Sequence, residues 1–259
     1  MIASITGREN KNIKLLKSLS RKHGRIKNGM YFAEGTRLVS EAIKYREEDI
    51  LFLLITNEYY EKNTNFINSL DERGKNMYTL STPLFKEACD TKTPQGIAAV
   101  MKITDAESQN IADMSLVLIL DGISEPGNMG AILRTAEAAG VDMVYITRGS
   151  ADIYNPKVVR STMGSIFRIN FKYIDNIDDI KNLKDFGFQL ISSSLEGSER
   201  IDDISFSEKR AIVIGSEAEG VSPEILEISD LKIRLDMHGL VESLNASVAA
   251  GIILYMLKK

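Results

Sequence analysis

Residues 231–259 read LKIRLDMHGLVESLNASVAAGIILYMLKK, and this stretch decides the fold of the second half of the chain. Alternating apolar residues from Leu231 to Leu235 predict a short strand. Gly239 allows a turn at low steric cost, and Ser243 is expected to cap the start of a helix rich in alanine, isoleucine and leucine. The stretch therefore predicts a strand–loop–helix junction whose polar groups point at one place.

Two further junctions of this type precede it. Residues 120–136 read LDGISEPGNMGAILRTA, and residues 212–222 read IVIGSEAEGVS. Each follows an apolar run that predicts a buried strand, and the helix expected after the first ends at Gly140, a typical helix-ending glycine. In a parallel α/β sheet, ligands bind beyond the carboxyl ends of the strands, so the three junctions are candidates for one site.

The glycine spacing of the second junction is also that of a phosphate-binding loop. However, Val221 stands where such a loop needs a lysine, and Glu217 and Glu219 lie inside it. These carboxylates would repel a polyphosphate and attract a sulfonium cation. The strand at 116–121 is not followed by G-x-G-x-x-G, which disfavours a dinucleotide-binding fold and an ordinary Rossmann methyltransferase.

In order and spacing, the three junctions resemble the three motifs of the SpoU (TrmH-type) RNA 2′-O-ribose methyltransferases, which belong to the SPOUT class. The resemblance extends from residue 116 to the end of the chain. It implies an α/β domain with a mostly parallel sheet and a trefoil-knotted topology that binds S-adenosylmethionine in the knot and works as a homodimer. Composition and periodicity do not predict the knot, because unknotted connections are the strong default.

The resemblance also assigns site residues. The expected catalytic positions are Asn128, Arg134, Glu217, Ser243 and Asn245, and the expected cofactor-binding positions are Gly215, Gly220, Leu235, Met237 and Leu244. Gly215 would let the cofactor approach the backbone closely, and the leucines and methionine would form an apolar wall for adenine. Two positions depart from the family pattern, which usually has glycine at Ala218 and proline at Asp236.

Asn128 and Arg134 are expected to make different contacts, because six residues along a helix place them near opposite sides. A guanidinium stays protonated in proteins, so Arg134 is expected to hold the phosphate beside the target ribose and lower the pKa of its hydroxyl. It is not expected to act literally as a general base.

The first part of the chain predicts a smaller α/β domain, with strands expected at 31–33, 50–55, 77–80 and 96–103 between helical segments. Its sequence resembles the ribosomal-protein-L30e-like substrate-binding domain that often precedes the SpoU domain, which implies RNA contact. We expect an RNA substrate-binding domain at 1–104, a polar linker at 105–114 and the methyltransferase domain at 115–259.

The net charge of −4 argues at first against nucleic acid, but the charge is unevenly distributed. Residues 1–30 contain eight basic side chains and one acidic side chain. The net charge of residues 1–105 is +4, and that of the remaining residues is −8. Such a basic edge can bind phosphates. Within it the expected RNA-binding residues are Lys11, Lys14, Arg21 and Lys22. The alternative is a solvated, lysine-rich helix.

Other features of the sequence concern the environment of the protein, membrane association and metal binding. A single cysteine, Cys89, excludes an internal disulfide and favours a reducing, cytoplasmic environment. No apolar run reaches membrane length, the N-terminus lacks an apolar signal core, and the two histidines show no metal-ligand spacing, so neither membrane nor metal is expected.

Two functions from different classes remain open. The first is an S-adenosylmethionine-dependent RNA ribose 2′-O-methyltransferase, acting on ribosomal RNA in preference to transfer RNA. The second is a non-catalytic RNA-binding protein that retains the knotted fold, an alternative that Ala218 and Asp236 keep open.

Overall fold

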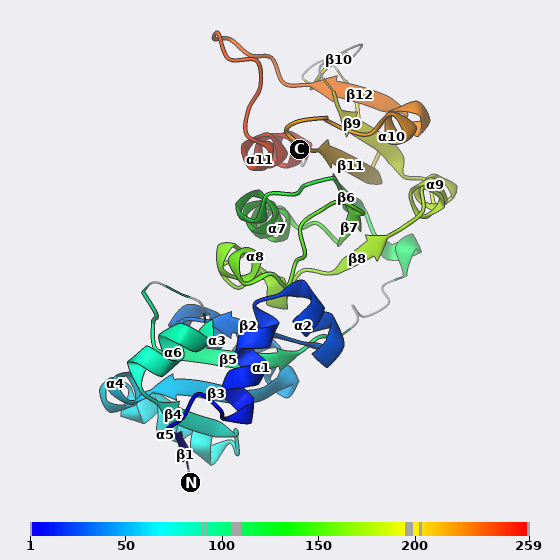
Figure 1. Ribbon diagram of the computed structural model, residues 1–259. Helices are drawn as coiled ribbons and strands as arrows, with labels where there is room; N and C mark the ends of the chain where they lie inside the picture. Colours follow the sequence, from blue (N-terminus) through cyan, green and yellow to red (C-terminus); the bar gives the residue numbers. More distant parts are fainter. Residues whose placement is uncertain are drawn as a thin grey trace. The chain divides into compact units, whose positions relative to one another are not determined.

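The computed structural model describes residues 2–89, 91, 93–104, 110–194, 199–201 and 204–257 (Figure 1). The chain divides into two compact units. The first comprises Met1–Asp105 and Asp152–Phe167, and the second comprises Ala106–Ala151 and Arg168–Lys259. Of the expected linker, residues 105–109 lie outside the described residues.

The first unit is built on a five-stranded mixed sheet of order β1-β4-β3-β5-β2. Its strands are β1 (Ala3–Ile5), β2 (Met30–Glu34), β3 (Ile50–Thr56), β4 (Met77–Leu80) and β5 (Ile97–Lys102). Its helices are α1 (Lys11–Leu19), α2 (Lys22–Asn28), α3 (Thr36–Tyr45), η1 (Glu47–Asp49), α4 (Asn57–Lys62), α5 (Thr64–Glu72), α6 (Thr82–Cys89), α8 (Pro156–Ser161) and η3 (Ser165–Phe167). The four strands expected in this region are all present.

Helices α1 and α6 cover one face of this sheet. Ile13, Leu16 and Leu19 recur at helical spacing on α1 and are fully buried, and they pack with Phe85 of α6 over the strands. Cys89 ends α6 as a buried free thiol whose pKa is raised by burial, which suits a structural rather than a nucleophilic role.

The second unit is a parallel sheet of order β10-β12-β9-β11-β6-β7-β8. Its strands are β6 (Leu116–Asp121), β7 (Met143–Thr147), β8 (Phe171–Ile174), β9 (Gln189–Ser193), β10 (Glu199–Arg200), β11 (Arg210–Gly215) and β12 (Leu231–Arg234). Its helices are η2 (Ile111–Asp113), α7 (Pro126–Ala139), α9 (Asp178–Asp185), α10 (Pro223–Ile228) and α11 (Ala246–Met256).

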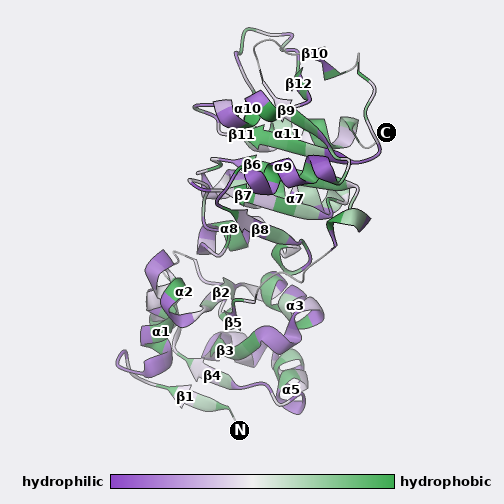
Figure 2. Cartoon of the chain, turned by 90° about the vertical axis from the view of Figure 1, so that its right-hand side faces the viewer, coloured by the Kyte–Doolittle hydropathy of each residue, from purple (hydrophilic) through white to green (hydrophobic). Residues whose placement is uncertain are grey.

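Helices cover both faces of the parallel sheet, with α7 and α11 on one side and α9 and α10 on the other (Figure 1). Strands buried on both faces need continuous apolar sequence rather than alternation. This explains the runs LVLIL in β6 and AIVI in β11, which are buried throughout and coloured hydrophobic in Figure 2.

Several local expectations were wrong. The sequence of residues 59–71 predicts one helix, but the structure has two, α4 and α5, which meet at Asn63. The sequence of residues 166–173 predicts a strand, but the structure has the short helix η3 followed by β8. The helix expected to begin at Ser243 begins at Ala246, where Asn245 is the cap and accepts a hydrogen bond from the backbone of Ser247 at 3.0 Å.

The segment Asp152–Phe167 belongs to the first unit although it lies within the sequence expected to form the methyltransferase domain. Three side-chain contacts hold it there. The ring of Tyr154 lies 4.6 Å from that of Tyr31, Arg160 pairs with the buried Glu34 at 3.2 Å, and Arg25 pairs with Asp152. Within the described residues, no helix has the length and apolar character needed to cross a membrane.

Candidate active site

The three sequence junctions lie at the carboxyl ends of β6, β11 and β12, where each strand leaves the parallel sheet. β6 and β11 are hydrogen-bonded neighbours, and Gly215 pairs in register with Asp121. The loops that follow these two strands therefore start side by side. The third loop leads from β12 to Asn245 and α11, and α11 packs beside α7.

A hydrogen-bonded cluster joins one side chain from each junction. Oε1 of Glu217 accepts hydrogen bonds from Nδ2 of Asn128 and from Nδ2 of Asn245, each at 2.7 Å. Oδ1 of Asn128 accepts a second bond from Asn245 at 2.9 Å, and the backbone of Ala246 also donates to Glu217 at 3.2 Å. Residues 89 and 28 positions apart in sequence thus meet at one carboxylate.

Helix caps orient both asparagines. Glu125 is the N-cap of α7 and accepts from the backbone N–H of Asn128 at 2.5 Å, a charge-assisted bond at a helix N-terminus. Asn245 uses Oδ1 to accept from both N–H and Oγ of Ser247, at 3.0 and 2.6 Å. Its amide nitrogen is therefore free to donate to the cluster, because the oxygen of an amide accepts hydrogen bonds and the nitrogen donates them.

Asp121 fixes the loop that carries Glu217. Its Oδ2 accepts from the backbone N–H of Ser222 at 2.7 Å, and its Oδ1 accepts from the hydroxyl of Thr147 at 2.9 Å. Within the loop, Ser216 and Gly220 exchange two backbone hydrogen bonds of 3.0 Å. Both ends of the loop are thus tied down, which holds the carboxylate of Glu217 in place.

Two hollows adjoin these loops. One of about 380 Å³ is lined mainly by apolar side chains, among them Ile201, Leu235, Met237, Leu244 and Met256. Another of about 320 Å³ is lined by Glu125, Asn128, Glu217 and Glu219 together with small residues of the first two junctions. The first is suited to an aromatic ring, and the second is suited to a cation.

Comparison with known families identifies this arrangement. Residues 115–255 match the family model described as SpoU rRNA Methylase family, and residues 10–99 match the MRM3-like substrate binding domain. The chain belongs to the SpoU rRNA methylase family. The resemblance stated from the three junctions is confirmed, as is the expectation of a substrate-binding domain before them.

Individual relatives are similar to this chain along nearly its whole length. The methylase is 35% identical over 254 residues to the 23S rRNA (guanosine(2553)-2′-O)-methyltransferase RlmP of Bacillus subtilis, with 98% of each chain covered. Its fold is that of the AdoMet-bound rRNA methyltransferase from Sinorhizobium meliloti (TM-score 0.85, 24% identity, 98% and 97% covered). It is also that of the SpoU methyltransferase AviRb from Streptomyces viridochromogenes in complex with AdoMet (TM-score 0.82, 23% identity, 96% and 97% covered).

The family assignment makes this protein an RNA methyltransferase with S-adenosylmethionine as methyl donor. The residues present fit that cofactor. Leu235, Met237 and Leu244 line the apolar hollow together, as an adenine ring requires. The carboxylates of the neighbouring hollow provide negative charge for a sulfonium.

Two expected catalytic residues of the methylase lie outside the cluster. Arg134 is exposed on α7, and it makes no hydrogen bond or ion pair with any residue that the structure describes. Ser243 is exposed two residues before the cap of α11 and likewise contacts no described polar partner. Asn128, Glu217 and Asn245 are the expected residues that the fold brings together.

The structure gives a reason for Gly215 within the loop itself. A Cβ at this position would lie 2.1 Å from the carbonyl carbon of Gly220 and 2.2 Å from the nitrogen of Val221. The close approach is thus made by the chain's own loop. Gly220 has a left-handed φ of 71° that closes the same loop. Ala218 has no positive φ, so the loop does not need the family's usual glycine there.

We expect Gly215→Ala to displace the loop of Glu217. Backbone overlap of this kind destabilises a fold by about 1–3 kcal/mol, and misplacing Glu217 should also weaken cofactor binding. Thermal unfolding and calorimetric titration with S-adenosylmethionine measure the two effects. Gly239→Ala is the matched control, since a Cβ there meets nothing within 4 Å. Parental stability of Gly215→Ala would contradict this explanation of the glycine.

The sequence did not single out three site residues. Glu125 and Asp121 belong to the first junction, but their hydrogen bonds to Asn128 and Ser222 depend on the folded loops. Asp236, noted only as a departure, pairs with Arg200 at 2.8 Å and Arg234 at 3.2 Å on the rim of the apolar hollow. The ion pairs supply a restraint on this loop where the family usually has the rigid ring of proline.

Proposed function

We propose that this methylase transfers a methyl group to a ribose 2′-hydroxyl of ribosomal RNA, with 23S rRNA as the first candidate. The observation that carries the proposal is the convergence of Asn128, Glu217 and Asn245 on one hydrogen-bonded cluster, in which Asn128 and Glu217 line a hollow of about 320 Å³. The full-length similarity to a 23S rRNA 2′-O-methyltransferase supports the choice of substrate.

The reaction forms a bond between the 2′-oxygen and the methyl carbon while the carbon–sulfur bond breaks and the hydroxyl proton leaves. S-adenosylmethionine supplies the electrophilic methyl group when bound. The cluster would position the cofactor loop and the ribose, because an aligned attack is worth several orders of magnitude in rate. Arg134 would hold the phosphate next to the ribose and favour loss of the proton.

Cofactor contact is proposed for the loop residues Gly215, Gly220, Leu235, Met237 and Leu244, and a supporting role in orienting the ribose for Ser243. The first of these acts through loop shape, since its Cα faces the backbone of residues 220–221. RNA binding is proposed for the domain at 1–104. A ribosomal substrate would place the protein in the cytoplasm.

A homodimer is also proposed, with the second copy seated on the outer face of α11. Large exposed apolar side chains lie on this face and on the loop before α11: Leu240 (104% exposed), Val241 (61%), Val248 (49%), Ile252 (38%) and Tyr255 (54%). Val241 and Ile252 also line the apolar hollow. Val248, Ile252 and Tyr255 recur at helical spacing opposite the buried face of α11. Contiguous apolar surface of this kind marks an interaction site, and the family resemblance specifies another copy of the chain.

We therefore expect the double variant Val248→Glu, Tyr255→Glu to be monomeric. Two carboxylates would have to lose their hydration inside the interface, which is strongly unfavourable. Sedimentation equilibrium should give twice the chain mass for the parent and a single chain mass for the variant. Phe186→Glu, which changes an exposed aromatic residue elsewhere, should stay dimeric. A monomeric parent would refute the dimer.

The alternative function is an RNA-binding protein that has lost catalysis. Calorimetric titration with S-adenosylmethionine, followed by mapping of ribose methylation on ribosomal RNA from cells with and without the gene, separates the two. The proposal predicts cofactor binding and one methylated ribose that disappears with the gene, at the guanosine named for the Bacillus subtilis relative if the site is shared. Identical methylation maps and no cofactor binding would favour the alternative.

A further inference from the structure

The structure separates the basic residues of the first thirty positions into paired and unpaired groups. Glu87 pairs with Arg8 at 2.8 Å and with Lys17 at 2.6 Å, and Glu9 pairs with Lys14 at 2.5 Å. Arg25 is buried against Asp152. Four cations are exposed and form no ion pair with any residue in the described part of the chain: Lys11, Arg21, Lys22 and Lys27. Three of these lie on α2 or directly before it.

The seven residues of α2 have one inward and one outward face. Gly24 and Arg25 are buried, and at 100° per residue Lys22, Ile26, His23 and Lys27 follow one another around the opposite side. All four are exposed, and Ile26 keeps 69% of its surface. In Figure 2, the ribbon of α2 carries both hydrophilic and hydrophobic colour.

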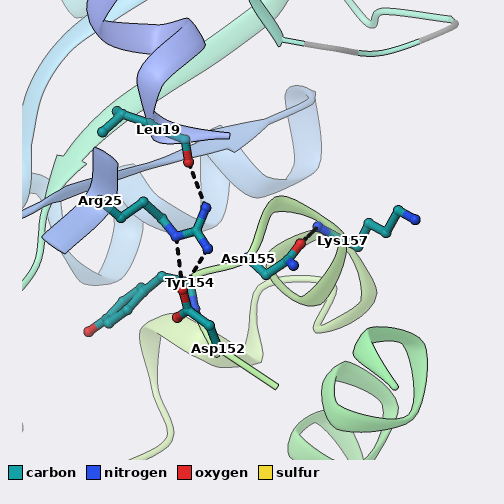
Figure 3. A network of polar contacts seen from close by, with 6 residues as sticks. All are labelled: Leu19, Arg25, Asp152, Tyr154, Asn155 and Lys157. Atoms are coloured by element: carbon teal, nitrogen blue, oxygen red, sulfur yellow. Dashed lines mark hydrogen bonds and ion pairs between the residues drawn. The ribbon is translucent and has the colours of Figure 1, made fainter. Parts of the chain in front are cut away.

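Buried contacts fix α2 in one orientation. The guanidinium of Arg25, only 3% exposed, donates to Asp152 Oδ2 from Nε at 3.0 Å and from Nη2 at 2.5 Å, and to the carbonyl of Leu19 at 2.7 Å (Figure 3). Gly24 lies so close to α1 that a Cβ would be 1.9 Å from the carbonyl oxygen of Ser18. The outward face is therefore presented without the freedom of a loop, which lowers the entropy lost on binding.

We propose that the outward face of α2 binds unpaired nucleotides of the substrate RNA. Arg21, Lys22 and Lys27 would contact phosphates, and Ile26 and His23 would lie against base faces. An RNA duplex hides its base faces within the stack, so an exposed isoleucine and imidazole between cations suit a loop or single strand. This inference rests on the proposed function, because it presumes an RNA substrate.

The test measures binding of two labelled RNAs by fluorescence anisotropy over a range of salt concentrations. One RNA is a hairpin with an unpaired loop, and the other is a fully paired duplex of equal length. The variants are Lys22→Ala with Lys27→Ala, and His23→Ala with Ile26→Ala. The matched control is Lys62→Ala with Lys86→Ala, which removes two exposed lysines from α4 and α6 of the same unit.

The lysine variant should flatten the salt dependence for the hairpin by about 1.4 in log–log slope, at roughly 0.7 per single-strand contact. The His23/Ile26 variant should lose about tenfold or more in hairpin affinity, the scale of one lost base stack, with little change for the duplex. The control pair should bind as the parent does. Unchanged hairpin affinity and slope in both α2 variants would overturn the proposal, as would equal losses for hairpin and duplex in the His23/Ile26 variant.

Methyl transfer by the parent distinguishes a failure of the α2 inference from a failure of the proposed function. If the parent methylates RNA while the α2 variants bind the hairpin normally, the α2 inference alone is wrong. A thermal unfolding curve equal to that of the parent shows that the first unit, which contains α2, is folded in the variants, so a loss of hairpin binding is then a property of the face of α2.

Discussion

Arg134→Ala is expected to lower the single-turnover rate of methyl transfer about 10²–10³-fold, the scale seen when a donor that stabilises developing negative charge is removed. Affinity for S-adenosylmethionine should stay within about twofold of the parent, because the apolar hollow is built from the β12 loop, from α11 and from Ile201. Arg134 is exposed on α7 and forms no hydrogen bond or ion pair with any described residue of its own chain. Its guanidinium is thus available to an RNA phosphate.

Arg134→Lys supplies the control for charge. A lysine retains the positive charge but lacks the planar pair of donors that matches a phosphate, so it should recover only a small part of the lost rate. Saturating cofactor and RNA isolate the chemical step from binding. A parental single-turnover rate in Arg134→Ala would make Arg134 a docking or structural residue.

Glu217→Ala is expected to reduce methyl transfer about 10²-fold, the scale for a catalytic geometry displaced by roughly 1 Å. Its carboxylate is the shared acceptor of Asn128, Asn245 and the backbone of Ala246. Removing it leaves the two amides without their partner and frees the loops from one another. Cofactor affinity should also fall, because a carboxylate beside the hollow suits a sulfonium cation.

Glu217→Gln separates the two roles of this side chain. The amide keeps one acceptor oxygen for the asparagines but removes the negative charge, so it should preserve stability and lose cofactor affinity. Glu227→Gln on α10, an exposed carboxylate without a partner among the described residues, is the control and should behave as the parent. Equal activity in Glu217→Ala and the parent would show that the cluster takes no part in catalysis.

The sequence predicted the site best for the residues whose positions follow from the strands that precede them. The three junctions follow buried strands, and parallel strands deliver their loops to one edge of a sheet, so the meeting of Asn128, Glu217 and Asn245 could be expected. Their exact geometry could not, because it depends on caps. Asn245 replaces Ser243 as the cap since its carbonyl oxygen reaches both N–H and Oγ of Ser247.

The features that could not be predicted depend on contacts that only the folded chain makes. Arg25 is one of the eight basic residues in the first thirty positions, but its partner Asp152 lies 127 positions away and makes it a buried structural residue. The loop contact of Gly215 could not be predicted either, because the backbone that approaches it is brought there by the fold of its own loop. Charge patterns and glycine motifs show what a residue type can do, and only the fold shows which partner it has.

The most direct test of the proposed function is transfer of an isotopically labelled methyl group from S-adenosylmethionine to unmodified 23S ribosomal RNA by the purified protein. Digestion to nucleosides and mass spectrometry then locate the label. The proposed function predicts label on a single nucleoside, on the ribose as a 2′-O-methyl group, and its loss in Glu217→Ala. Label on a base, or no transfer by a parent that binds both cofactor and RNA, would contradict it.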